Sequence, residues 1–132
     1  MRLNWNEVQR GDIRTQWAGM NVTMNPQGWI ALSRVTYERM GSPKAFVVLF
    51  DPVNNRIGLK PAALTTRNAF PVRCLQPPRA KVIRAGRLIK DYRIDLPATV
   101  KFDDADTDQD GILLLDLRTA RVIGRPRTTA AL

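Results

Sequence analysis

Among the ionisable side chains of this chain, positive charges outnumber negative ones. Its 132 residues include 21 Lys and Arg but only 12 Asp and Glu, which gives a formal net charge of +9. Arginine suits the bidentate recognition of phosphate, so this balance favours an acidic partner such as nucleic acid. The basic residues are densest between positions 67 and 93, where Asp91 is the sole acid. The candidate phosphate contacts in this segment are Arg67, Arg73, Arg79, Lys81, Arg84 and Arg87.

The same residues have a second interpretation. Arginines on a protein surface are often solvated, or pair with acids such as those of the Asp-rich segment near position 106. Four more arginines follow residue 117 and could form either a phosphate-seeking arm or a soluble tail: Arg118, Arg121, Arg125 and Arg127. Stacking on bases could add to phosphate binding through Trp5, Trp17 and Trp29, although tryptophan is more often a core residue.

The Asp-rich segment has the start of a calcium-binding pattern. Asp106, Asp108 and Asp110 alternate and precede Gly111, and carboxylates spaced in this way can surround a hard cation. A complete calcium loop needs a bidentate Glu where this chain has Leu117. We therefore interpret the segment as a hairpin turn and assign it no metal, with calcium binding by these three aspartates as the alternative.

Several classes of enzyme are excluded by what the sequence lacks. There is no histidine, which removes triads that use a His base and metal sites that need imidazole. The single cysteine, Cys74, can form neither an internal disulfide nor a multi-cysteine zinc site. No GxxxxGK[ST] loop or GxGxxG turn is present to hold a nucleotide. We expect a binding protein that is not an enzyme, with no cofactor and no small-molecule substrate.

The apolar segments are too short for a membrane helix. The longest run, residues 45–50, falls far below the roughly 20 residues that cross a bilayer. Residues 1–7 lack the apolar stretch of a secretory signal. We expect no membrane association and a cytoplasmic location.

The first half predicts a hairpin, a short helix and a second hairpin over residues 20–61. Strands are expected at 21–24 and 29–33, joined by a turn at Asn25 to Gly28. Ser33 can cap a short helix that Gly41 ends. Strands at 45–50 and 56–60 follow, with a loop between them.

The second half repeats this order less clearly. Residues 62–80 contain three prolines and directly follow Pro61, which predicts an irregular connector. Beyond it we expect strands at 81–84, 99–102 and 112–117, and a helical turn at 86–92. Residues 81–117 therefore read as a possible degenerate second copy of 20–61, and 118–132 as a basic tail, all within one domain of residues 1–132. The expected fold class is mainly β with short helices.

Residues 28–41, GWIALSRVTYERMG, followed by AFVVLFDPVNNRIGLKP, resemble the AbrB and MraZ swapped-hairpin proteins. Gly28 and Gly41 match the family's spacing of a glycine before a strand and a second glycine after the helix. The resemblance covers about a third of the chain and implies a β-barrel made of two interleaved hairpin-helix-hairpin copies. It also implies a dimeric, DNA-binding transcription factor, and the whole chain looks like small bacterial proteins of unassigned role.

The family's usual DNA-contacting residues are replaced in this chain. Trp29 stands where a basic residue is common, and Tyr37-Glu38 stand where an arginine pair is common. Arg34 and Arg39 are the nearby alternatives for phosphate contact. Two functions stay open: a homodimeric DNA-binding regulator that uses arginine contacts to phosphates, and a structural or protein-interaction module that binds no nucleic acid.

Overall fold

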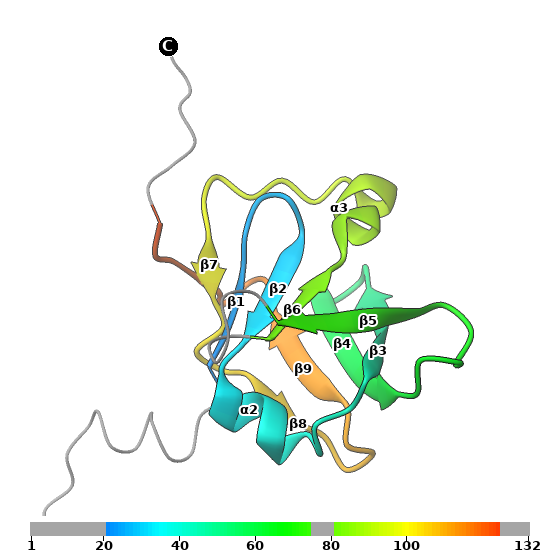
Figure 1. Ribbon diagram of the computed structural model, residues 1–132. Helices are drawn as coiled ribbons and strands as arrows, with labels where there is room; N and C mark the ends of the chain where they lie inside the picture. Colours follow the sequence, from blue (N-terminus) through cyan, green and yellow to red (C-terminus); the bar gives the residue numbers. More distant parts are fainter. Residues whose placement is uncertain (1–20, 75–80, 125–132) are drawn as a thin grey trace, which may run out of the picture.

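The computed structural model describes residues 21–74 and 81–124, which form a mainly β fold. Ten short antiparallel strands make one strongly curled half-barrel sheet, and two short helices accompany it (Figure 1). The strand order is β10-β7-β1-β2-β6-β5-β3-β4-β9-β8. No helix in the described ranges is long and apolar enough to cross a bilayer. The elements are β1 (Val22–Met24), β2 (Trp29–Leu32), α2 (Arg34–Arg39), β3 (Ala45–Asp51), β4 (Arg56–Ala62), β5 (Ala69–Cys74), β6 (Lys81–Arg84), α3 (Gly86–Tyr92), β7 (Val100–Lys101), β8 (Asp106–Thr107), β9 (Leu113–Asp116) and β10 (Arg121–Val122).

The turn between β1 and β2 follows from its residue types. The Asn25 side chain accepts hydrogen bonds from the backbone N–H groups of Gln27 and Trp29 at 3.0 and 2.9 Å. Gly28 completes the turn with a φ of +91°, a conformation that glycine adopts without strain. The predicted hairpin is confirmed, with Val22 opposite Leu32 and Met24 opposite Ile30.

Helix α2 begins and ends where the sequence predicts. The hydroxyl of Ser33 accepts from the backbone N–H of Thr36 at 3.2 Å and caps the first turn. At the other end the N–H of Gly41 donates to the carbonyl of Glu38 and that of Ser42 to Tyr37. This paired pattern, with Gly41 at a φ of +90°, is a Schellman motif.

Strand β5 corrects the prediction for the proline-rich connector. Residues 62–80 were expected to be irregular, but Ala69–Cys74 pair with β3 at one end and with β6 at the other. Pro71 is tolerated because the ladder to β6 starts only at the next residue, Val72. Pro61 lies in β4 beyond Leu59, the last residue of that strand paired with β9. Each proline therefore lies where a ladder of hydrogen bonds ends, so the backbone N–H that it lacks is not needed for strand pairing.

The second half contains the expected strands and helix and two short additions. Helix α3 spans the predicted residues 86–92, and β6, β7 and β9 lie within or at the predicted ranges. Strand β8 lies in the acidic segment and pairs with β9. Strand β10 pairs with β7, so the segment expected to be a basic tail begins inside the sheet.

The core fills the concave side of the curled sheet. It combines residues of both halves, so neither half encloses a core by itself. The largest fully buried side chains are Phe46, Phe102, Met24, Ile30, Leu32, Ile57, Leu59, Ile83, Leu113 and Leu115.

Candidate nucleic-acid interface

Core residues alternate with residues that face away from the core along four adjacent strands of the sheet, β1, β2, β6 and β5. Side chains on a strand alternate between the two sides of a sheet. Ile30 and Ile83 lie opposite each other and are fully buried, so their neighbours along the chain point outward. We call the resulting side the outer face; it consists of Thr23, Trp29, Ala31, Arg73, Val82 and Arg84. Val82 is buried, and only the two arginines of this set are exposed.

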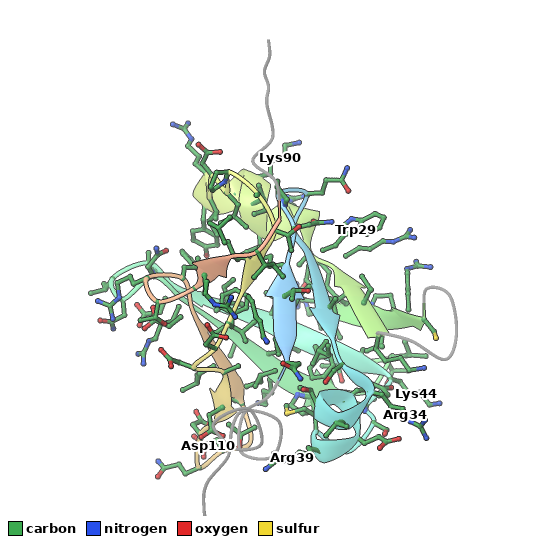
Figure 2. All side chains as sticks on the ribbon, turned by 90° about the vertical axis from the view of Figure 1, so that its left-hand side faces the viewer. Trp29, Arg34, Arg39, Lys44, Lys90 and Asp110 are labelled. Carbon is green, nitrogen blue, oxygen red and sulfur yellow. The ribbon has the colours of Figure 1, made fainter. Side chains whose placement is uncertain are left out.

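An aromatic and a cationic side chain stack on the outer face. Trp29 lies directly opposite Arg84 in the β2–β6 ladder, and the guanidinium carbon of Arg84 lies 4.6 Å from the centre of the indole ring. Figure 2 shows Trp29 projecting away from the sheet. Trp29 is half-buried and Arg84 is exposed, so the guanidinium lies over one face of the indole ring and keeps its positive charge in solvent.

Arg73 extends this surface by one strand. It lies opposite Val82 of β6, which in turn lies opposite Ala31 of β2. Arg73 is exposed and makes no ion pair with any residue of the described ranges. The structure thus brings Arg73 and Arg84, two of the predicted phosphate contacts, onto the same side of the sheet.

Arg73 belongs to a row of residues that lie opposite one another on successive strands, and this row ends at an arginine neutralised by an acid. Beyond Ala31 the row passes through Thr23 and Lys101 to Arg121 of β10. The guanidinium of Arg121 donates to the carboxylate of Asp103 at 2.8 and 3.2 Å. This bond lowers the pKa of Asp103 and raises that of Arg121, so both stay charged and occupied with each other.

Three predicted residues gather around α2. The ammonium of Lys81 lies 5.5 Å from the ring centre of Tyr37. Arg34 is paired with Glu38 at 3.1 Å, and both side chains are exposed. Arg39 lies in the last turn of the same helix. In Figure 2, Arg34 and Lys44 project to the same side of the molecule as Trp29.

Lys44 is a further basic residue on the side of the molecule that carries Trp29, and the sequence prediction did not include it. It is exposed and immediately precedes β3. Its carbonyl accepts from the N–H of Val72, which holds the backbone at this position against β5. Only the pairing of β3 with β5 reveals this proximity, since the two strands are distant in the sequence.

The other predicted basic residues lie elsewhere or outside the described ranges. Arg67 is exposed in the connection between β4 and β5. Arg87 lies on α3 and is paired with Asp91 at 3.2 Å. Arg79 lies outside the described residues, as do Trp5 and Trp17. The seven predicted contacts within the described ranges are therefore divided among the outer face, the α2 end and two separate exposed sites.

Negative charge collects in another part of the chain. Residues 103–116 contain six aspartates, whereas β1, β2, β5 and β6 contain no acidic residue. Figure 2 shows Asp110 on the opposite side of the molecule from Trp29. The outer face therefore has unbalanced positive charge.

The alternating aspartates form a hairpin turn. The Asp108 carboxylate accepts from the backbone N–H groups of Asp110 and Ile112 at 2.8 and 3.0 Å. Gly111 supplies a φ of +77°. Within residues 21–74 and 81–124, no group of three or more Cys, Asp or Glu is placed to hold a metal ion. The aspartates accordingly set the local backbone conformation.

Comparisons of this chain with protein-family models, curated proteins and solved structures gave no match.

Proposed function

We propose that this protein binds nucleic acid through the outer face, as a small DNA-binding regulator and not as an enzyme. The single observation that carries the proposal is the Trp29–Arg84 stack on a surface of strands without acidic residues. A partly exposed aromatic ring beside arginines can stack on a base while the guanidinium groups neutralise phosphates. Arg73 supplies the second free guanidinium of this surface.

The strand order supports the finer proposal that the fold is a swapped-hairpin arrangement of two degenerate copies. In this proposal the strands of the second copy, β5, β6, β7 and β9, correspond in that order to β1, β2, β3 and β4. The correspondence can be checked by exchanging each strand with its counterpart. Every observed pairing among these strands then becomes another observed pairing, except that β3–β4 has no β7–β9 counterpart. Helices α2 and α3 follow β2 and β6, so they are exchanged as well. On this proposal the second copy begins at β5, before the residue 81 that the sequence indicates.

The missing β7–β9 pairing accounts for the open side of the half-barrel. Strand β8 pairs with β9 and β10 pairs with β7, so both strands have other partners at the place where the barrel would close. The swapped-hairpin proposal also supports DNA as the nucleic acid, because the sequence resemblance implies DNA-binding members. A homodimer, which the same resemblance implies, would present two equivalent outer faces.

A salt-dependent binding measurement tests the proposal. Fluorescence anisotropy with labelled duplex and single-stranded DNA is recorded over a series of salt concentrations for the wild type and an Arg73→Gln, Arg84→Gln double variant. If both arginines contact phosphates, the slope of log K against log salt falls by roughly 1.8 on duplex DNA. Trp29→Ala should weaken binding to single strands by about 1–3 kcal/mol if one base stacks on the indole.

The matched control removes two positive charges from another surface. Lys60 of β4 and Arg118, which pairs with Asp116, are exposed and lie on other strands or turns. The Lys60→Gln, Arg118→Gln variant should keep the wild-type salt slope. Equal effects of the two double variants would show that net charge alone attracts DNA, and absence of binding at low salt would refute the proposal.

One observation favours the second candidate function, a protein-interaction module. Within the described residues, the β3 edge has no strand partner beyond Val47, and this free part borders an apolar groove.

A further inference from the structure

A groove opens where β3 and β5 separate. The two strands pair only from Ala45 opposite Pro71 to Val47 opposite Ala69. Beyond Val47, β3 continues beside β4 to Asp51, while its other edge has no strand partner in the described ranges. The groove has a volume of about 630 Å³, and α3 forms its opposite wall through residues such as Leu88 and Tyr92.

The edge of β3 presents backbone hydrogen-bonding groups to this groove. In antiparallel strands, the N–H and C=O groups of successive residues point to alternate neighbours. The Lys44 carbonyl accepts from Val72 of β5, so the backbone groups of Val48 and Phe50 also point to that side. The ladder to β5 has ended before these two residues. They are therefore free to pair with another extended chain.

The walls of the groove are apolar and aromatic. Val48, Phe50, Phe70 and Leu88 line it together with Tyr92. The rings of Phe50 and Tyr92 lie 4.5 Å apart at an angle of 46°. Tyr92 is nevertheless 50% exposed, so a large apolar surface remains available to an incoming side chain.

Within the described ranges, uncompensated positive charge lies next to the groove in sequence, at Arg67 and Lys90. Arg87 and Asp91 both line it and are paired with each other at 3.2 Å, so they largely cancel. Arg67 directly precedes the lining residue Asn68 and is exposed, with no ion pair among the described residues. Lys90 is exposed on the same helix as Arg87. The surroundings complement an acidic ligand.

We propose that this groove binds an extended acidic peptide of a partner protein by strand addition to β3. The peptide backbone pairs with Val48 and Phe50, and an apolar side chain packs on Phe50 and Tyr92. A second copy of the chain fits less well, because α3 stands where the partner's own sheet would have to continue. The site is separate from the outer face, so this proposal does not depend on nucleic-acid binding.

Amide hydrogen exchange measured by NMR tests the proposal with an internal control. The probe is the peptide Glu-Val-Glu-Phe-Glu-Val-Glu, compared with a version in which Lys replaces each Glu. The acidic peptide should slow exchange of the Val48 and Phe50 amides. The Val47 and Leu49 amides, which face β4, should change little.

A second measurement checks the aromatic anchor. Tyr92→Ala should weaken binding of the fluorescein-labelled acidic peptide about tenfold or more, as expected for a hot-spot aromatic residue. Val35→Ala, which alters an exposed apolar residue on α2, should leave the affinity unchanged.

Three results would overturn the assignment. One is equal binding of the acidic and the basic peptides, and another is binding of neither peptide with no protection at Val48 and Phe50. The third is protection of these amides on raising the protein concentration without peptide, which would assign the edge to a second copy.

Discussion

Gly28 and Gly41 form a natural pair for measuring how tightly the two halves of the fold pack. Both glycines have nearly the same positive φ, +91° and +90°. A Cβ atom at Gly28 would lie 2.8 Å from the Ala85 carbonyl oxygen and 2.9 Å from the Cα atom of Gly86. A Cβ atom at Gly41 would meet nothing within 4 Å. Alanine at either position therefore strains the backbone, but only at Gly28 does it also collide with the other half.

The expected losses of stability follow from this difference. An unfavourable backbone conformation costs on the order of 1–3 kcal/mol, which applies to Gly28→Ala and Gly41→Ala alike. Forcing an extra atom into packed surroundings adds about 1–3 kcal/mol. The added cost falls on Gly28→Ala, because two of the three nearest atoms are backbone and cannot rotate away; the third is the Ile89 Cγ1 atom at 2.8 Å. This substitution would also disturb the 3.0 Å hydrogen bond from the Ala85 N–H to the Gly28 carbonyl.

Urea unfolding of both variants measures the difference. With a slope near 2 kcal/mol/M, the Gly28→Ala midpoint should lie roughly 0.5–1.5 M below that of Gly41→Ala. Failure of Gly28→Ala to fold under conditions where Gly41→Ala folds would agree with the reasoning. Equal midpoints would refute the close approach of the β1–β2 turn to the start of α3.

Two further predictions concern buried and turn hydrogen bonds. Thr36 is buried, and its hydroxyl accepts from the backbone N–H of Asn21 at 2.8 Å and bonds to the Ser33 hydroxyl at 2.9 Å. Thr36→Val should cost about 1–3 kcal/mol in urea unfolding, and Thr36→Ser, which keeps the hydroxyl, should cost less. Hydrogen bonds from the Asn54 side chain, then from its backbone, lower the pKa of Asp51 from 3.8 to about 2. Because the folded pKa is the lower one, the contribution of Asp51 is complete above pH 3.8 and is lost as the pH falls towards 2. The stability of Asp51→Ala should therefore fall less than that of the wild type over this range, and parallel pH profiles would contradict the assignment.

Much of the local structure could be predicted because short-range chemistry decides it. Asn25 and Gly28 specify a turn through side-chain bonding and backbone freedom, and Ser33 and Gly41 specify the limits of a helix. The same reasoning failed for β5, because a proline's cost in a strand depends on where the neighbouring ladder ends.

The candidate site could be predicted only in part, for a related reason. Composition indicated arginines as candidate phosphate contacts, but it could not separate Arg73 and Arg84 from Arg87, which has an acid one helical turn away. The pairing of Trp29 with Arg84 and the nearness of Lys44 to β5 both join residues far apart in the chain.

The amino-acid sequence by itself determined the turns, the helix limits and the excess of positive charge, since these depend on residues within a few positions of one another. Tertiary structure alone decided the strand order, which side of the sheet each arginine occupies, and the free edge of β3. The physical reason is that strand pairing exchanges hydrogen bonds between distant segments. A side chain's partner is thus set by register and not by proximity in sequence.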